Sequence, residues 1–196
     1  MQKLKRNDSG IWVLVAVPGE FAHPDANIVY MGVGKVNAAL AAQHIIDTEN
    51  PKLIVSLGTA GSAFYDYGQI VNVSKWVQRD MNLTELLGPK YVVPMSDEPQ
   101  ILEYGKIDEK YRGGGHSMAV CGSGDSFVRT IEKELWDIVE MEGFAIAYAC
   151  RRADVPFVAY KFISDGKEGH TTDKMWADIL DEAKEKLHKV YEEEIK

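Results

Sequence analysis

The sequence predicts a single α/β domain, residues 1–196, with a mixed, mainly parallel central sheet between helices in three layers (α/β/α). Continuous apolar runs at residues 11–17, 53–57 and 155–163 predict strands that are buried on both faces, as parallel sheets require. Segments with helical apolar spacing lie between these runs, and no Pro/Gly/Ser-rich linker or charge block divides the chain. With 196 residues, 45% of them hydrophobic, the chain can bury one sizeable core.

The first strand, residues 11–17, is followed by a loop that carries Glu20 and His23. A second short strand at residues 28–31 leads into the turn GVGK at residues 32–35. A helix is expected next, because apolar residues recur at helical spacing: Val36, Ala39, Leu40 and Ile46. The turn lacks the third glycine of a Rossmann fingerprint and the flanking residues of a P-loop, so we expect no dinucleotide or nucleotide cofactor.

The middle of the chain holds a second glycine-rich segment. The strand at residues 53–57 runs into a loop at residues 58–62 (GTAGS), whose glycines would let the backbone approach a ligand closely. A plain tight turn is the alternative interpretation. The next strand is expected at residues 68–73, residues 76–81 could line a site or an interface, and residues 88–111 read as a polar excursion.

The strand at residues 118–121 leads into residues 122–128 (GSGDSFV), where Phe127 belongs either to the core or to a site. Near the C-terminus, the spacing of apolar residues at 176–191 predicts an amphipathic helix that packs on the sheet. Its apolar stripe consists of Trp176, Ile179, Leu180, Ala183, Leu187, Val190 and Tyr191.

Residues 138–166 carry the most chemistry per residue. A small, apolar helix is expected at residues 143–152 and an inner strand at residues 155–163, followed directly by Ser164 and Asp165. Asp165 would then lie at the carboxyl edge of the sheet, where open α/β sheets bind their ligands. A carboxylate that follows an apolar strand tends to be partly desolvated, which raises its pKa and favours a catalytic role.

Glu142 is the second candidate, because it stands between Met141 and an almost wholly apolar helix, where a merely solvated carboxylate is unexpected. The alternative is that Glu140, Glu142 and Asp165 cap helix ends or face water.

Composition excludes several classes of partner. The formal net charge of -8 argues against nucleic acid or anionic membrane, both of which need clustered Lys and Arg. The charged N-terminus precedes only a short apolar strand, so it predicts neither a signal peptide nor a membrane span. Cys121 and Cys150 each lie in an apolar segment and are expected to be reduced buried thiols, which suits the cytoplasm.

Neither a metal site nor a nucleophilic triad is expected. No Gly-x-Ser-x-Gly elbow or Cys-x-x-Cys pair occurs. The histidines are scattered without the spacing of metal ligands: His23, His44, His116, His170 and His188.

Taken together, these segments resemble the nucleoside phosphorylase and nucleosidase superfamily, and most closely the 5′-methylthioadenosine/S-adenosylhomocysteine nucleosidases. The resemblance lies in VEME at residues 139–142 with the Ala-rich helix after it, VPFV at residues 155–158 and ISD at residues 163–165. The turn GVGK, the segment GTAG and the segment GSGDSF match further motifs of the superfamily in the same order. The resemblance implies a small-molecule purine nucleoside as substrate and a homo-oligomeric assembly.

The resemblance also implies catalytic roles. Asp165, oriented by Ser164, would protonate the purine at N7, a general-acid role worth about 10²–10⁴-fold in rate. Glu142 would bind the ribose hydroxyls and stabilise the cationic transition state of glycosidic cleavage. Glu20 would act as the base that activates water. The substrate contacts implied are Thr59, Ala60 and Gly61 under the ribose, Phe127 on the purine, and Val128 and Met141 beside them.

The chain departs from the family pattern in two places. Members usually carry a much longer segment between the first-strand glutamate and the glycine turn, whereas here only residues 21–31 separate them. Lys161 stands where the nucleosidases commonly have arginine, and Ser56 stands where bacterial purine nucleoside phosphorylases have a phosphate-binding arginine. We therefore expect hydrolysis by water; phosphorolysis and a non-catalytic nucleoside-binding homologue are the alternatives.

Overall fold

The structure is a computed structural model that describes residues 2–3, 7–86, 88–105, 117–128, 134–166 and 176–196. The strands are β1 (Gln2–Lys3), β2 (Ile11–Val15), β3 (Asn27–Tyr30), β4 (Leu53–Ser62), β5 (Ile70–Gln78), β6 (Leu102–Glu103), β7 (Ser117–Ser123), β8 (Ile138–Glu140) and β9 (Phe157–Asp165). The helices are α1 (Lys35–Glu49), α3 (Gly143–Arg152) and α4 (Trp176–Val190), which ends in the π-helical turn η1 (Tyr191–Ile195).

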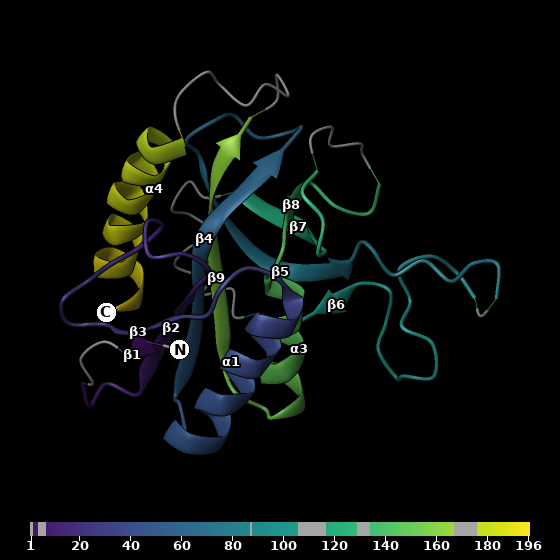
Figure 1. Ribbon diagram of the computed structural model, residues 1–196, viewed down its shortest axis with the longest axis horizontal. Coiled ribbons are helices and arrows are strands. Elements are labelled where there is room, and N and C mark those ends of the chain that lie inside the picture. The colour runs from purple at the N-terminus through teal and green to yellow at the C-terminus, as the bar shows by residue number, and fades with distance from the viewer. Residues whose placement is uncertain (1, 4–6, 87, 106–116, 129–133, 167–175) are drawn as a thin grey trace.

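The strands form one mixed sheet with helices on both faces (Figure 1). Its order is β1-β3-β2-β4-β8-β7-β5-β6, and β9 pairs with both β4 and β5. Because β8 also pairs with β4, the strands β4, β9, β5, β7 and β8 close into a ring. The helices α1 and α3 pack against each other on one side, while α4 covers β4 and β9 from the other. The predicted three-layer fold with a mixed sheet is confirmed, and the closure is a further feature that strand patterns do not reveal.

Strand pairing brings the site segments together. The parallel strands β2, β4 and β9 end at the same edge of the sheet. The register between β4 and β9 runs from Ile54 opposite Phe157 to Gly61 opposite Asp165, with an irregularity between Ala60 and Gly61. Antiparallel β8, a strand that the sequence analysis does not predict, places Val139 opposite Gly61.

The expected glycine loop at residues 58–62 is wrong, because these residues continue β4 to Ser62. Their glycines serve close packing within the sheet. A Cβ on Gly58 would lie 3.2 Å from Oε1 of Glu20 and 3.4 Å from Nζ of Lys161, so a side chain here would press on both groups.

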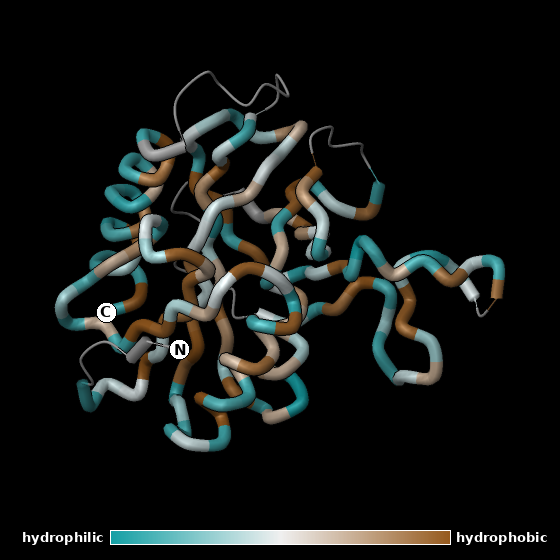
Figure 2. Tube along the Cα trace, in the orientation of Figure 1, coloured by the Kyte–Doolittle hydropathy of each residue, from teal (hydrophilic) through white to brown (hydrophobic). Residues whose placement is uncertain are grey.

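The helix α3 is almost wholly buried, as expected. Its first residue, Gly143, packs on the buried indole of Trp76 so closely that a Cβ would lie 2.0 Å from Cζ3. The C-terminal helix α4 is amphipathic, with its hydrophobic side toward the sheet and its hydrophilic side outward (Figure 2). Its buried residues include Ile179, Ala183 and Leu187, in agreement with the predicted stripe.

The helix α1 is confirmed, but two of its larger apolar residues, Val36 and Leu40, do not face the core. Its buried face consists of Ala38, Ala41, Ala42 and Ile45. Val36 and Leu40 remain 69% and 66% exposed. Small residues on the buried face let α1 lie close to α3. Val36 and Leu40 form an apolar surface on the exposed face.

The two cysteines, Cys121 and Cys150, are free and buried, as predicted. The polar excursion is described as far as residue 105 and is mostly irregular, with the two-residue strand β6; residues 106–111 lie outside the described residues. Within the described parts of the chain, no helix is long and apolar enough to cross a membrane.

Candidate active site

A cavity of about 330 Å³ lies at the carboxyl edge of β2, β4 and β9. All ten residues singled out from the sequence line it: Glu20, Thr59, Ala60, Gly61, Phe127, Val128, Met141, Glu142, Ser164 and Asp165. Six further lining residues are not indicated by the sequence: Ala16, Val17, Val33, Ser126, Val139 and Glu140. Arg79 also lines the cavity, so of the two alternatives for residues 76–81, a site or an interface, Arg79 belongs to the site. Residues from the whole length of the chain therefore converge on one space.

Glu20 is buried in the loop after β2 and is held by three hydrogen bonds. Its Oε1 accepts from the amide of Thr59 (2.9 Å) and from the hydroxyl of Thr59 (2.8 Å). Its Oε2 accepts from the amide of Val17 (3.2 Å). The shortened segment of residues 21–31 thus still places this carboxylate in the cavity wall.

Glu142 precedes α3 and is tied to the glycine turn before α1. Its Oε1 accepts from the amide of Gly34 (2.7 Å). Gly34 has φ +97°, a conformation that favours glycine, and this aims its N–H at the carboxylate. Burial, together with the nearby charge of Glu140, raises the pKa of Glu142 to about 7. This carboxyl is therefore partly protonated near neutral pH.

Glu140 and Lys161 form a buried ion pair below the cavity. Nζ of Lys161 lies 3.2 Å from Oε2 of Glu140. The same carboxylate accepts from the hydroxyl of Ser123 and from the amides of Glu142 (3.0 Å) and Gly143 (2.8 Å). Burial alone would raise the pKa of Glu140, but Lys161 and these donors hold it below the usual value. Glu140 therefore fixes the backbone that carries Glu142, a role that no local sequence pattern indicates.

Asp165 ends β9 at the rim of the cavity and is partly exposed. Burial raises its pKa, and the hydroxyl of Ser164 opposes the rise in part. Oγ of Ser164 also lies 3.3 Å from the carbonyl oxygen of Ala60, so this side chain connects the ends of β4 and β9. The geometry thus gives a carboxyl group that is protonated more readily than a solvated aspartate.

The far wall is formed by the segment after β7. The ring of Phe127 is 68% exposed and faces the cavity, so it is not a core residue. Arg79, the residue after β5, supports this wall because its guanidinium donates to the carbonyl of Gly124 (2.9 Å) and to the hydroxyl of Ser126 (3.0 Å). An exposed ring over a backbone wall is suited to stacking with a flat heterocycle.

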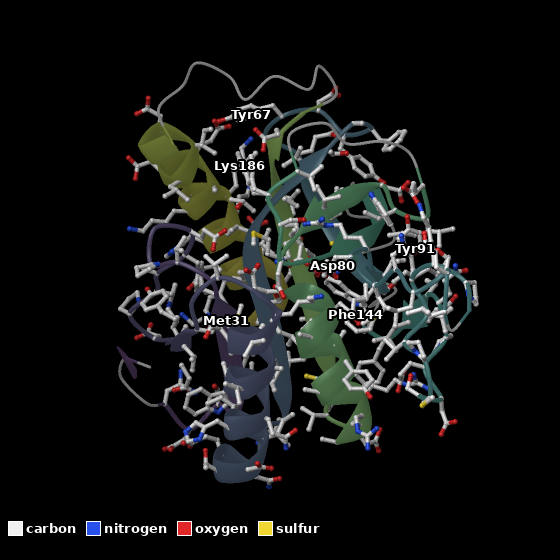
Figure 3. All side chains as sticks on the ribbon, turned by 45° about the vertical axis from the view of Figure 1, so that its right-hand side comes forward. Met31, Tyr67, Asp80, Tyr91, Phe144 and Lys186 are labelled. Carbon is white, nitrogen blue, oxygen red and sulfur yellow. The ribbon has the colours of Figure 1, made fainter. Side chains whose placement is uncertain are left out.

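A second link joins the glycine turn to this wall. The amide of Lys35 donates to Asp125 (2.7 Å), and the amide of Asp125 donates to Asp80 (2.9 Å). Nζ of Lys35 also forms an ion pair with Asp80 (2.5 Å). Asp80 is labelled near the centre of Figure 3. Hydrogen bonds within this set lower the pKa of Asp80 against the effect of its burial. The turn therefore positions Glu142 on one side and the Phe127 segment on the other.

Among the described residues, the donors close enough together to hold a metal ion are His23, His188 and Glu192, and none of them lines the cavity. His116 and His170 lie outside the described residues.

Comparison with known proteins agrees with this architecture. The family model of the phosphorylase superfamily matches residues 14–196, which is most of the chain. The chain belongs to the phosphorylase superfamily. Within this superfamily it is 33% identical over 178 residues to the 5′-methylthioadenosine/S-adenosylhomocysteine nucleosidase of Colwellia psychrerythraea, covering 79% of this chain and 73% of that protein. It is 28% identical over 193 residues to the nucleosidase of the same name from Staphylococcus haemolyticus, covering 91% and 84%.

A crystal structure of the corresponding Helicobacter pylori nucleosidase shares the fold, with a TM-score of 0.77 at 21% identity over 93% of this chain and 97% of that one. The superfamily fold that the motifs indicate is thus the fold that the chain adopts.

Proposed function

We propose that this protein hydrolyses the N-glycosidic bond of a purine nucleoside, with 5′-methylthioadenosine or S-adenosylhomocysteine as first candidates, and releases free adenine. The observation that carries the proposal is the convergence of Glu20, Glu142 and Asp165 on one cavity beside the exposed ring of Phe127. The curated relatives named above are nucleosidases for these two substrates. The Helicobacter pylori structure holds a ligand in which an aminopyrrolopyrimidine is joined to a hydroxypyrrolidine, a likeness of a nucleoside.

Asp165 supplies the proton for the leaving base. Breaking the bond expels the purine while positive charge builds on the sugar, so the base leaves more easily once N7 is protonated. Burial raises the pKa of Asp165, so this carboxyl holds a proton more readily than a solvated aspartate does. The neighbouring Ser164 holds the end of the strand against Ala60 and so limits the rotation of the donor.

Glu142 binds the ribose hydroxyls and stabilises the sugar cation. The amide of Gly34 occupies Oε1 and sets the direction of the carboxylate. A carboxylate with a pKa of about 7 gains most from a cation, because the positive sugar restores the charged form that burial disfavours. Its stabilising effect therefore grows from the ground state to the transition state.

Glu20 is the base that accepts the proton of the attacking water. Three donors fix its two oxygens, which leaves lone pairs directed at the cavity. Thr59 and Ala60, at the end of β4, lie between this carboxylate and Asp165 in the cavity wall. The base and the acid then act on opposite sides of the sugar, as inversion by water requires.

Charge around the cavity favours water over phosphate as the second substrate. Four carboxyl groups line the cavity (Glu20, Glu140, Glu142 and Asp165). Lys161 is committed to Glu140, and Arg79 donates to the backbone on the purine side. A phosphate dianion about 4 Å from one like charge would be repelled by roughly 1–4 kcal/mol at effective dielectrics between water and a protein surface.

Product analysis tests the proposal. The protein is incubated with 5′-methylthioadenosine, S-adenosylhomocysteine or adenosine, with and without phosphate, and base and sugar are quantified by chromatography. We expect free adenine and free sugar at equal rates in both conditions. Turnover that depends on phosphate and yields sugar 1-phosphate would make the protein a phosphorylase. Tight binding of nucleoside without turnover would make it a non-catalytic binder.

We also propose that the protein forms a homo-oligomer through the outer face of α1. Val33, Val36 and Leu40 are 47%, 69% and 66% exposed, and Val33 also lines the cavity. A contiguous exposed apolar surface of this kind typically marks an interface. Light scattering after size exclusion should show a smaller species for Leu40→Glu and the wild-type species for Lys184→Glu, a change at an exposed position of α4, on the other side of the sheet.

The cytoplasm is the compartment that we propose for this activity. Support comes from Cys121 and Cys150, which are buried, unpaired thiols of the kind that reducing compartments preserve. Fractionation of the source cells, followed by detection with an antibody, checks this.

A further inference from the structure

The C-terminal helix and the loop that carries Glu20 meet in a cluster of potential metal ligands. His23 lies in that loop, three residues after Glu20, and His188 and Glu192 lie on α4 and η1. One ligand atom from each of the three residues lies within 4.8 Å of the other two. The scattered spacing of the histidines conceals this group, because 165 residues separate the first two members.

We propose that His23, His188 and Glu192 form a structural binding site for a divalent transition-metal ion of the zinc class. Two imidazole nitrogens and one carboxylate oxygen are the donor types that zinc prefers, and the fourth position would be left to water. Metal–ligand bonds of 2.0–2.2 Å place tetrahedral ligand atoms roughly 3.3–3.5 Å apart, so small side-chain rotations suffice to gather the three donors. The ion would fasten the Glu20 loop to the end of α4.

His23 is already held in position for this role. Its side chain is only 4% exposed. The ring packs against those of Phe21 (centroids 6.5 Å apart), Tyr191 (4.8 Å) and His188 (4.7 Å). The short segment after Glu20 carries both Phe21 and His23. The carbonyl of Phe21 accepts a hydrogen bond from the hydroxyl of Tyr30 (3.0 Å), and this bond helps to hold the segment in place. A ligand whose ring is packed on several sides loses little conformational freedom when it binds an ion.

The nitrogen that faces the other donors is Nε2, which lies 2.5 Å from Oε1 of Glu192. The amide of Asp25 donates to Nδ1 (3.1 Å), so Nε2 carries the proton of the neutral ring and donates it to the carboxylate. A metal ion at Nε2 would take the place of that proton, which moves to Nδ1, and the hydrogen bond from the amide of Asp25 is then given up.

The electrostatic surroundings favour a cation. Glu193 and Asp25 lie close to the cluster, on η1 and on the loop of residues 17–26. Two lysines compete with such an ion: Nζ of Lys196 is 3.2 Å from Glu192 and 3.6 Å from Asp25, and Nζ of Lys189 is 3.9 Å from Glu193. Lys196 is exposed at the chain end, so its side chain can swing into water when an ion takes its place.

Direct metal titration tests the site independently of catalysis. Protein treated with chelator and desalted is titrated with Co²⁺, followed by visible absorption, and with Zn²⁺, followed by calorimetry. We expect one equivalent to bind, with the strong d–d bands of four- or five-coordinate cobalt. Zinc at a hundredfold excess over its Kd should raise the Tm by roughly 5–10 °C.

Variants locate the binding. His188→Ala and Glu192→Gln should each weaken zinc binding at least tenfold and abolish the cobalt bands. His44→Ala removes an exposed histidine on α1 and should bind like the wild type. Glu192 is exposed, so its variant keeps the test valid if His188→Ala does not fold. Wild-type binding no tighter than that of Glu192→Gln, or an equal loss in His44→Ala, would overturn the proposal.

Discussion

Nζ of Lys161 lies 3.2 Å from Oε2 of Glu140, and the two side chains are only 3% and 2% exposed. The strands β9 and β8 that carry these residues do not pair with each other, but both pair with the end of β4. The ion pair therefore connects β8 to β9 beside the cavity, close to Gly58. A buried charge of this kind is stable only with its partner present.

Lys161→Met keeps the length of the side chain but leaves Glu140 as an unpaired buried charge. We expect the free energy of unfolding to fall by about 3–5 kcal/mol, measured by urea denaturation at pH 7. The double variant Lys161→Met/Glu140→Gln removes both charges and should recover most of this loss. If the single variant loses less than about 1 kcal/mol, the pair contributes to function rather than to stability.

Asp165→Asn removes the proposed proton donor without changing its size. Adenine release from 5′-methylthioadenosine should fall by about 10²–10⁴-fold, while the far-UV circular dichroism and Tm stay near those of the wild type. Asp154→Asn makes the same chemical change in the exposed turn before β9, where φ is +53° and asparagine is well tolerated. This control should retain full activity. Wild-type turnover in Asp165→Asn would remove the general-acid assignment.

Glu142→Gln keeps the hydrogen bond from Gly34 but removes the charge that we propose faces the sugar. We expect kcat/KM for adenosine to fall by at least about 10²-fold, as for loss of one preorganised electrostatic group. The wild type should prefer adenosine to 2′-deoxyadenosine, and the variant should show a weaker preference. Equal kinetics of the two proteins on both nucleosides would leave Glu142 a structural residue.

The pKa of Glu142 also predicts opposite effects of pH on activity and stability. The carboxyl has a pKa of about 7 when folded, against 4.5 as its ordinary value, so the folded protein holds the proton more tightly. Ionisation therefore costs stability, which should decline as the pH rises from about 4.5 through 7, by at most about 3 kcal/mol from this group. In the same interval kcat/KM should rise, because the charged form acts on the sugar.

Urea denaturation of the wild type and of Glu142→Gln at pH 5 and pH 8 separates this contribution from that of other groups. The variant should be the more stable of the two at pH 8 and close to the wild type at pH 5. A difference between the two proteins that does not change with pH would contradict the assigned pKa.

Gly143→Ala changes helix propensity and core packing in opposite directions, so the two effects on the free energy of unfolding can be compared. Alanine is favoured over glycine within a helix by about 1 kcal/mol. Its Cβ, however, would lie 2.0 Å from Cζ3 of Trp76, and overpacking of a core costs about 1–3 kcal/mol or more. We expect net destabilisation in thermal unfolding, and partial recovery when Trp76→Leu makes room. A stabilised Gly143→Ala would show that the indole can move aside.

Local patterns sufficed for most of the longer strands and helices and for ten of the residues that line the cavity. The apolar runs and the Ala-rich segment of residues 143–152 predict the strands and α3, because burial on both faces of a sheet demands continuous apolar sequence. Glu142 and Asp165 stand out because each carboxylate stands beside an apolar helix or strand. Desolvation of a charge at such a position costs free energy, so its presence there indicates a function. Parallel strand order then places them at one edge.

Contacts between distant segments were decided only by the tertiary structure. The partner of Glu140 is Lys161, on a strand that does not pair with β8, and the partners of His23 lie at the opposite end of the chain. Helical periodicity could not determine that α1 buries Ala38 and Ala42 while Leu40 stays outside, because apolar residues occur on both faces of this helix. The glycines of residues 58–61 continue β4 because β9 pairs with them along their whole length. Periodicity reports which residues share a face, whereas pairing, closure of the sheet and burial of charge depend on which faces meet.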